Sequence, residues 1–404
     1  MRLDDQSWLT APATRAVMAA LEAAGGPDCA RFVGGCVRNA LIGAPVADVD
    51  IATTLKPEET DRAIRAAGLK AVPTGIAHGT VTAVSGHQPF EITTLRRDVS
   101  TDGRNATVAF TDDWAEDAAR RDFRLNALYA DREGQVFDPT GEGVADAAAG
   151  RIVFVGDPET RIREDYLRIL RFFRFFAWYG RGEPDASALK ACRALASGMT
   201  RLSAERVSKE LMTLLGASDP RVAMAAMAEA GVLAQVLPEA AAGHLFEAAV
   251  QQGTDPVIRL MILLPGDERL VREASARLRF PNSTRDRLAA AAVAAPAVSL
   301  TMSDPEVRAA VYRFGSRAVT DALHLRMAQQ PEAAGDGRRL LALAEGWKRP
   351  SMPVGGRDLA RLGVEPGPGT GRLLKAFEDS WIADDFPSEG HAERLAALFS
   401  PPRG

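Results

Sequence analysis

The spacing of apolar and polar residues changes character near residue 150. Before that point, helical spacing over 13–24 gives way to short apolar runs, such as 79–85 and 90–96, that are typical of β-strands. From residue 158 onward the chain is rich in alanine, leucine and arginine at helical spacing, broken by proline and glycine, and it holds no convincing strand. The pattern therefore predicts an α+β fold, in which a strand-containing N-terminal part is followed by an all-helical one.

Three segments near this change have predictions of their own. Residues 97–112 lack helical periodicity and hold many turn residues, which indicates a mobile loop with a short strand. Residues 113–123 predict a helix, and Asp122 and Asn126 would share one of its faces if that helix continues. Residues 158–179 predict a single helix that carries arginines among large apolar residues.

Composition and charge place the chain among ordinary globular proteins. Its 404 residues suggest more than one domain, and the net charge of −4 gives no overall basic field. Residues 151–210 nevertheless hold twelve Lys/Arg against eight Asp/Glu, so a local basic strip could bind a phosphate backbone. The three cysteines have no metal spacing, and neither a signal peptide nor a membrane span is evident. These features predict a cytoplasmic protein with no membrane partner; they give no oligomeric state.

Residues 31–50 hold the clearest candidate chemistry. An apolar run ends at Gly34-Gly35, where a helix begins, and Arg38 follows one turn later. Glycine has no Cβ, so the backbone there can approach a ligand closely, and the free N–H groups of a helix start suit a phosphate. A guanidinium adds a rigid set of donors to the same place.

Two aspartates complete this stretch. Asp48 and Asp50 are two residues apart, so on a strand they project from one face and repel each other unless a cation joins them. Oxygen ligands alone suit magnesium or manganese. Glu91 could be a third carboxylate facing this pair, or an exposed strand residue. Each feature alone is common in ordinary loops, but together they indicate a triphosphate held over a metal site.

A second constellation lies within 158–179. Asp165 and Arg168 are spaced i, i+3 on the predicted helix, where an ordinary ion pair is one interpretation. The other is base recognition, because a carboxylate acceptor and a guanidinium donor match the amino group and ring nitrogen of cytosine and adenine. Uracil and guanine would leave those groups unpaired. Arg174 lies about opposite Asp165 on a straight helix, which leaves Arg171 and Arg174 for phosphate, RNA or packing.

Taken in order, these motifs resemble those of the class II CCA-adding tRNA nucleotidyltransferases, within the polymerase-beta-like nucleotidyltransferase superfamily that also contains bacterial poly(A) polymerases. The resemblance covers about residues 30–180. The motifs that carry it are Gly34-Gly-Cys-Val-Arg38 with Asp48-Val-Asp50; Glu91-Ile-Thr-Thr-Leu-Arg; Arg120-Arg121-Asp122-Phe-Arg-Leu-Asn126-Ala; and Glu164-Asp165-Tyr-Leu-Arg168-Ile-Leu-Arg171-Phe-Phe-Arg174-Phe.

The resemblance implies roles for these residues and an architecture for the chain. Asp48 and Asp50 would be catalytic and bind Mg²⁺, and Asp165 and Arg168 would read the base. The implied nucleotide site consists of Gly35, Arg38, Arg121, Asp165, Arg168, Arg171 and Arg174. The implied domains are a nucleotidyltransferase head with a small mixed sheet (1–145), and an all-helical neck for base recognition (146–205), body (206–300) and tRNA-binding tail (301–404).

The implied reaction is addition of C, C and A to the 3′ end of tRNA, from CTP and ATP, with release of pyrophosphate. The alternatives are a poly(A) polymerase, an enzyme that adds only CC or only A, and an inactive RNA-binding protein of the same fold. Asp102-Gly-Arg104 resembles the flexible loop of complete CCA-adding enzymes and favours full addition. Asn39 and Arg124 depart from the family pattern, which often has Asp and usually has Thr at these places.

Overall fold

The computed structural model describes residues 1–76, 79–102, 105–240, 243–264, 266–365 and 367–398. The chain forms two compact units, 1–238 and 239–404. The described strands all lie in the first unit, so the predicted α+β class is confirmed. No helix in the described ranges is long and apolar enough to cross a membrane. The finer division into head, neck, body and tail stays a prediction.

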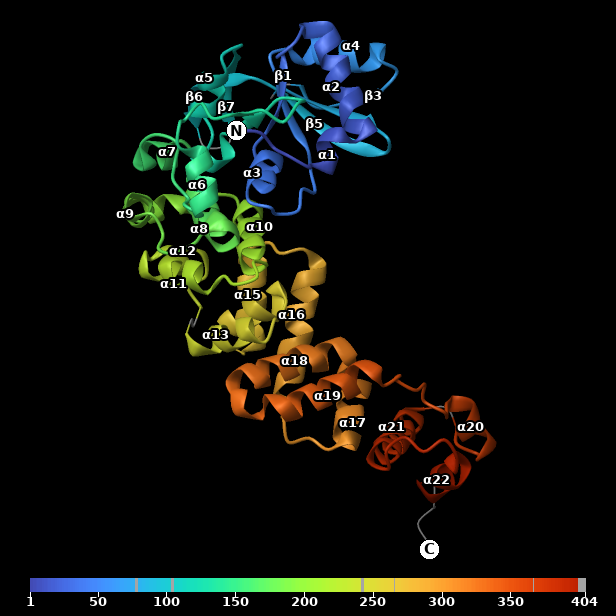
Figure 1. The fold of residues 1–404 in the computed structure, drawn as a ribbon. Helices are drawn as coiled ribbons and strands as arrows, with labels where there is room; N and C mark the ends of the chain where they lie inside the picture. The colour runs from blue at the N-terminus through green and yellow to red at the C-terminus, as the bar shows by residue number, and fades with distance from the viewer. Residues whose placement is uncertain (77–78, 103–104, 241–242, 265, 366, 399–404) are drawn as a thin grey trace, which may run out of the picture. The chain divides into compact units, whose positions relative to one another are not determined.

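A mixed seven-stranded sheet organises the described part of the first unit, in the order β3-β4-β5-β2-β1-β8-β9 (Figure 1). Its strands are β1 (Ala30–Val33), β2 (Asp50–Thr53), β3 (Lys70–Gly75), β4 (Thr80–Ser85), β5 (Gln88–Thr94), β8 (Tyr129–Ala130) and β9 (Val136–Phe137). β2 pairs antiparallel with β1 and parallel with β5, so Asp50 lies opposite Glu91. Asp50 and Glu91, which belong to motifs far apart in the sequence, are therefore neighbours on two adjacent inner strands of the sheet.

In the described residues, six helices accompany this sheet, and α2, α3 and α4 pack directly on its strands. The six are α1 (Ser7–Thr10), α2 (Pro12–Gly25), α3 (Gly35–Leu41), α4 (Pro57–Ala66), α5 (Trp114–Ala119) and α6 (Gly143–Ala149). α2 buries Val17, Met18 and Leu21, which recur at helical spacing, and it packs against α4 and β4. The helix predicted over 13–24 is thus present; its last residue is Gly25, and Gly26 is its C-cap.

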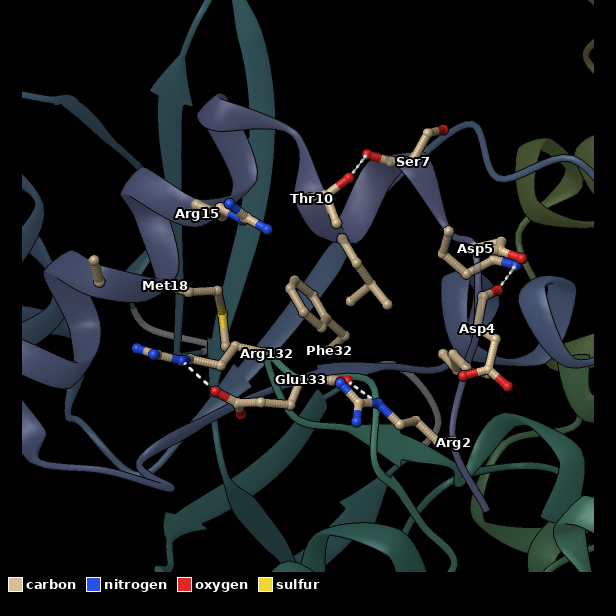
Figure 2. Close-up of a pocket in the computed structure, with 14 residues that line it drawn as sticks. Arg2, Asp4, Asp5, Ser7, Thr10, Arg15, Met18, Phe32, Arg132 and Glu133 are labelled. Atoms are coloured by element: carbon tan, nitrogen blue, oxygen red, sulfur yellow. Dashed lines mark hydrogen bonds and ion pairs between the residues drawn. The ribbon is translucent and has the colours of Figure 1, made fainter.

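The N-terminal segment is tied to the turn between β8 and β9. Arg2 bridges to Gln135, and Arg2 Nε donates to the carbonyl of Glu133 at 2.9 Å. Arg2 and Glu133 line a cavity of about 750 Å³. Figure 2 shows them with Phe32 and Met18, which also line it. Arginines and carboxylates both line this cavity, and none of the predicted site residues does. It is therefore separate from the candidate site described below.

The segment 97–112 differs from its prediction. It forms most of a two-stranded antiparallel hairpin, β6 (Arg96–Asp102) and β7 (Asn105–Phe110), rather than a loop with one short strand. Hairpin pairing is made by backbone groups, so it does not require the apolar alternation that this segment lacks. Gly103 and Arg104, two of the three residues that favoured full CCA addition, lie outside the described residues.

The helical part of the first unit continues the chain after residue 150. Its helices are α7 (Pro158–Glu164), α8 (Leu167–Tyr179), α9 (Ala186–Leu195), α10 (Ala204–Leu215), α11 (Arg221–Glu229) and α12 (Val232–Val236), with a 3₁₀ turn at Ala196–Arg201; another 3₁₀ turn, Arg124–Asn126, precedes β8. The single helix predicted over 158–179 is wrong, because the chain is extended at Asp165. Neither glycine nor proline marks this break, so the sequence pattern did not reveal it.

Aromatic packing joins α8 to the segment that precedes the sheet's last strands. The Phe123 ring lies 4.8 Å from that of Phe154 and 5.2 Å from that of Phe175, and Phe154 stacks on Phe172 at 6.0 Å. Phe123, Phe154 and Phe172 are fully buried. Because Phe123 is fixed against α8 in this way, its neighbour Asp122 is held beside the arginines of that helix.

The described part of the second unit is helical throughout. It contains α13 (His244–Gln251), α14 (Pro256–Leu263), α15 (Glu268–Arg277), α16 (Asn282–Ala294), α17 (Asp304–Phe314), α18 (Ser316–Gln329), α19 (Ala334–Gly346), α20 (Gly356–Arg361), α21 (Pro368–Ala383) and α22 (His391–Leu398). Its last helices share a core around Tyr312, Phe377 and Trp381. The all-helical prediction for this region is confirmed for the residues described.

Candidate active site

The Gly34-Gly35 turn connects β1 to α3 as the sequence predicts. Gly34 has φ +71°, a left-handed conformation that favours glycine. A Cβ atom there would lie 3.6 Å from the carbonyl oxygen of Asn126 and 3.7 Å from Nη1 of Arg121. The turn is therefore both unusual in backbone conformation and next to a guanidinium of the Arg120-Arg121-Asp122 motif.

The acidic residues gather near this turn. Asp50 is the first residue of β2, whereas Asp48 lies in the irregular segment before it, so only one of the pair is on the predicted strand. Both residues are exposed, and Glu91 is the register partner of Asp50 on β5. Both interpretations of Glu91 therefore hold: it is an exposed strand residue, and it is a neighbour of Asp50.

Desolvation and like-charge repulsion both act on Asp50. Partial removal of water raises the pKa of Asp50, and the negative charges of Glu91 and Asp48 raise it further, to about 6. Arg121 acts in the opposite direction but does not cancel this effect. The negative charges of the three carboxylates are therefore only partly compensated.

The donor set of this site fits a divalent cation. Within the described residues, no cluster of three or more His, Cys, Asp or Glu side chains is already arranged to hold a metal ion. Asp48 and Asp50 nevertheless offer only oxygen atoms, which magnesium prefers, and a cation would relieve the repulsion that raises the pKa of Asp50. The residues present thus fit the Mg²⁺ that the family resemblance implies.

Arg121 is held rigidly beside the turn. Its guanidinium donates to Asp117 Oδ2 at 3.0 Å and to the Tyr129 hydroxyl at 3.2 Å. Burial alone would raise the pKa of Asp117, but the charges of Arg121 and Arg120 hold it at about 2. The fixed orientation suits a residue that contacts a phosphate, because little side-chain freedom remains to be lost on binding.

Arg38, predicted to add donors beside the Gly34-Gly35 turn, is buried and already hydrogen-bonded. It is only 6% exposed, and it donates to Asn39 Oδ1 at 2.8 Å and to the Tyr179 hydroxyl at 2.9 Å. Its guanidinium carbon also lies 3.9 Å from the centre of the Tyr179 ring. Asn39, the first departure from the family pattern, is therefore a neutral acceptor that orients Arg38.

A polar chain connects Arg38 to α8. Arg38 Nη1 donates to Asn126 Oδ1, Asn126 Nδ2 donates to Asp122 Oδ1 at 3.1 Å, and Arg171 Nε donates to Asp122 Oδ2 at 2.8 Å. Asp122 and Asn126 do come together, although no helix carries them both, because α5 ends at Ala119. Burial alone would raise the pKa of Asp122, and the charge of Arg171 holds it at about 2.

Arg171 and Arg174 meet the same carboxylate of α10. Arg174 Nε donates to Glu210 Oε2, and Arg171 Nη1 lies 3.8 Å from Glu210 Oε1. Glu210 is 8% exposed, so this is a nearly buried ion pair. These contacts show that both arginines of α8 pack against α10. Their proposed roles toward phosphate or RNA stay predictions.

Asp165 and Arg168 are near each other in the chain but not on one helix. Asp165 ends α7 in an extended conformation, and its Oδ1 accepts the Leu167 N–H at 3.1 Å, which caps α8. Its Oδ2 accepts Arg206 Nη2 at 2.6 Å. Arg168 instead donates to Glu164 and, at 2.8 Å, to the carbonyl of Arg161. The intrahelical ion pair that the spacing suggested is replaced by these two separate pairings.

Arg124, the second departure from the family pattern, does not enter this site. Its side chain pairs with Asp146 at 2.6 Å, and with Glu142, both at α6. Arg124, where the family usually has Thr, therefore links the Arg120-Arg121-Asp122 segment to α6 through ion pairs.

Sequence reasoning missed four residues that orient the predicted ones. Asp117 and Tyr129 hold Arg121, while Arg206 and Glu210 of α10 hold Asp165 and Arg174. A signal was present at Glu210, a carboxylate between Val207, Leu211 and Leu214 on the apolar side of α10. Buried acids among apolar residues usually have a cationic partner, but the sequence does not say which one.

A glycine turn beside an acidic group at the edge of a mixed sheet, followed by a helical region, is the arrangement of a nucleotidyltransferase head. Two family models match the chain. The Poly A polymerase head domain matches residues 30–153, and the probable RNA and SrmB-binding site of polymerase A matches residues 183–243.

Relatives with names extend this match over most of the chain. The CCA tRNA nucleotidyltransferase 1, mitochondrial, of Mus musculus is 32% identical over 370 residues, covering 89% of this chain and 84% of the relative. The CCA-adding enzyme of Lacticaseibacillus paracasei is 32% identical over 407 residues and covers 96% of both. The solved structure of the Bacillus stearothermophilus CCA-adding enzyme in complex with CTP aligns with TM-score 0.75 and 25% identity, over 96% of this chain and 97% of that one. The chain belongs to the family of CCA-adding tRNA nucleotidyltransferases.

Proposed function

We propose that this enzyme adds C, C and A in turn to the 3′ end of tRNA, taking CTP and ATP as substrates and releasing pyrophosphate. Membership of the family over nearly the whole chain is the observation that carries the proposal. The acidic group beside the Gly34-Gly35 turn supports an active rather than an inactive member, because the carboxylates that the chemistry needs are present.

Asp48 and Asp50 would hold Mg²⁺ in this reaction. When bound, the metal supplies positive charge for the triphosphate and for the oxygens that enter and leave at the α-phosphorus. Arg121, fixed by Asp117 and Tyr129 beside the turn, contacts the phosphates of the incoming nucleotide. Arg38 would act indirectly. Its hydrogen bond to Tyr179 joins α3, the helix that follows the glycine turn, to the end of α8.

Asp165 and Arg168 would read the base at the junction of α7 and α8. A carboxylate oxygen has two lone pairs, so Asp165 Oδ2 can accept a base amino group while it retains Arg206. Arg168 would exchange one of its present contacts, with Glu164 or the Arg161 carbonyl, for the ring nitrogen beside that amino group. Both cytosine and adenine present this donor–acceptor order, and uracil and guanine reverse it.

Incubation of the purified protein with tRNA that lacks its 3′ terminal CCA, and with each labelled nucleotide, tests this proposal. We expect two C residues from CTP alone, one A after them when ATP is added, and no further extension. A long run of A would identify a poly(A) polymerase, and arrest after CC, or A addition only to tRNA ending in CC, would identify a partial enzyme. Absence of incorporation with intact tRNA binding would leave the inactive RNA-binding protein.

A further inference from the structure

One side of α10 faces the residues proposed to contact the nucleotide. Arg206 and Glu210 lie one turn apart on this helix, so their side chains share a face. Arg206 reaches Asp165, and Glu210 reaches Arg174 and approaches Arg171. α10 also packs along α8. A helix with no residue among the predicted contacts thus touches three of them.

Both oxygens of the Asp165 carboxylate accept a hydrogen bond, one of them from Arg206. Oδ1 is committed to the N–H of Leu167 at the start of α8, and Oδ2 to Arg206 Nη2 at 2.6 Å. The side chain of Asp165 is 21% exposed and that of Arg206 is 26% exposed, so water competes only in part for this pair. A carboxylate held by both oxygens cannot rotate freely about its terminal bond.

The ring of Tyr166 strengthens this arrangement. It packs against the backbone of Gly198 so closely that any Cβ at that position would clash with it. Tyr166 therefore fixes the turn in which Asp165 lies, and Arg206 fixes the end of the side chain. Together they restrict the orientation of the Asp165 carboxylate.

We propose that Arg206 is a positioning residue that orients the Asp165 carboxylate for recognition of a base amino group, and so sets the preference for cytosine and adenine over uracil and guanine. This inference rests on the proposed function. Arg206 does not itself contact the reacting atoms. Without it, Oδ2 is free to turn towards water or towards Arg168, and the amino group loses an acceptor in a fixed place.

Single-turnover incorporation of CTP and UTP, on the same truncated tRNA, tests this role. The proteins are wild type, Arg206→Gln, Arg206→Lys and a control, Arg193→Ala, which removes an arginine from an exposed ion pair with Glu229 on the same helical region. We expect Arg206→Gln to lower the CTP-to-UTP preference about tenfold, mainly through weaker CTP binding and with a maximal rate near that of wild type. Arg206→Lys retains the positive charge and should fall between the two, and Arg193→Ala should match wild type.

A second comparison separates positioning from a general structural role. In an Asp165→Ala background, Arg206→Gln should leave the CTP-to-UTP preference unchanged, because the carboxylate on which Arg206 acts is absent. Circular dichroism checks that each variant is folded, and if Arg206→Gln is not, Arg206→Lys carries the test. An unchanged preference in the folded Arg206 variants would overturn the inference while wild-type addition of C, C and A left the proposed function standing. A wild type without such addition would instead refute the proposed function.

Discussion

Two groups of charged side chains in the first unit are built in opposite ways. The acidic group brings Asp48, Asp50 and Glu91 together, and desolvation, with the charges of Glu91 and Asp48 added to it, raises the pKa of Asp50 to about 6. Arg121, whose charge acts on Asp50, is already paired with Asp117. Around α8, in contrast, each carboxylate meets a guanidinium: Asp122 with Arg171, Glu210 with Arg174, Asp165 with Arg206, and Glu164 with Arg168.

The difference indicates different tasks. A group of like charges is unfavourable alone and becomes favourable only when a cation from outside joins it, which suits a metal site. A set of mutually satisfied ion pairs is complete without a ligand, and its value lies in holding donors and acceptors in fixed directions. The acidic group would thus serve nucleotide transfer, and the ion pairs around α8 would serve selection of the base. Variants of the acidic group should lower the rate of transfer without changing base preference, and variants of the ion pairs should do the reverse.

Loss of the acidic pair should have the largest effect. Asp48→Ala or Asp50→Ala should reduce nucleotide transfer by at least about 1,000-fold, as expected when a ligand of the catalytic metal is removed. Binding of tRNA, measured by filter retention, should persist. Asp61→Ala, which removes an aspartate from an ion pair with Arg65 on α4, is the matched control and should retain full activity. Near-normal turnover by either variant of the acidic pair would refute the metal assignment.

Removal of Asp165 should instead relax selection. Asp165→Ala leaves Arg168 able to donate to a carbonyl, so the preference for CTP over UTP should fall by roughly ten- to a hundredfold. The same change also removes the cap of α8. Asp157→Ala, which removes the cap of α7 without touching Arg206, controls for that loss. An equal CTP-to-UTP preference in wild type and Asp165→Ala would reduce Asp165 to a structural ion-pair partner.

The Asp122–Arg171 pair should contribute to stability in a pH-dependent way. The pKa of Asp122 is lowered from 3.8 to about 2, so its contribution is complete above pH 4 and is lost as the pH falls from about 4 to about 2. The shift corresponds to about 2 kcal/mol. Asp122→Asn should therefore destabilise the first unit by about that amount near pH 7 and by much less near pH 2. Urea unfolding across this range measures it, and a difference that is constant with pH would contradict the linkage.

The smallest expected effect concerns the RNA surface. Residues 151–210 carry a net charge of +4, and phosphate contacts made there would release counterions. Affinity for tRNA should then fall about tenfold between 50 and 200 mM salt, which corresponds to roughly two such contacts. An affinity that is flat over this range would remove the basic strip from the account.

Much of the fold could be read from the sequence because local signals agreed with the tertiary structure. The glycines after α2, the Gly34-Gly35 turn and the alternation in β4 are features of single segments, and each lies where it was expected. The break at Asp165 was not visible, because it is made by a side chain that caps the next helix and by Tyr166 against Gly198. Contacts of that kind join residues that no periodicity connects.

The candidate site was predictable to a similar extent. Asp48 and Arg121 both act on Asp50, and Arg121 lies beside Gly34, as the family resemblance implied. The orientation of Arg38, buried against Asn39 and Tyr179, was not predictable, since Tyr179 lies 141 residues away in the chain. Arg206 likewise reaches Asp165 over 41 residues. Short motifs identify which residues take part, and long-range packing decides which way they point.

Equilibrium binding of CTP and UTP to an Asp50→Asn protein tests the separation of chemistry from selection most directly. The triphosphate and ribose contributions are common to both nucleotides and cancel in the ratio of dissociation constants. We expect the catalytically impaired Asp50→Asn protein still to prefer CTP, and the Asp50→Asn, Asp165→Ala protein to bind both nucleotides about equally. Equal binding of CTP and UTP by the Asp50→Asn protein would contradict this expectation, because selection would then depend on the acidic group and not on Asp165.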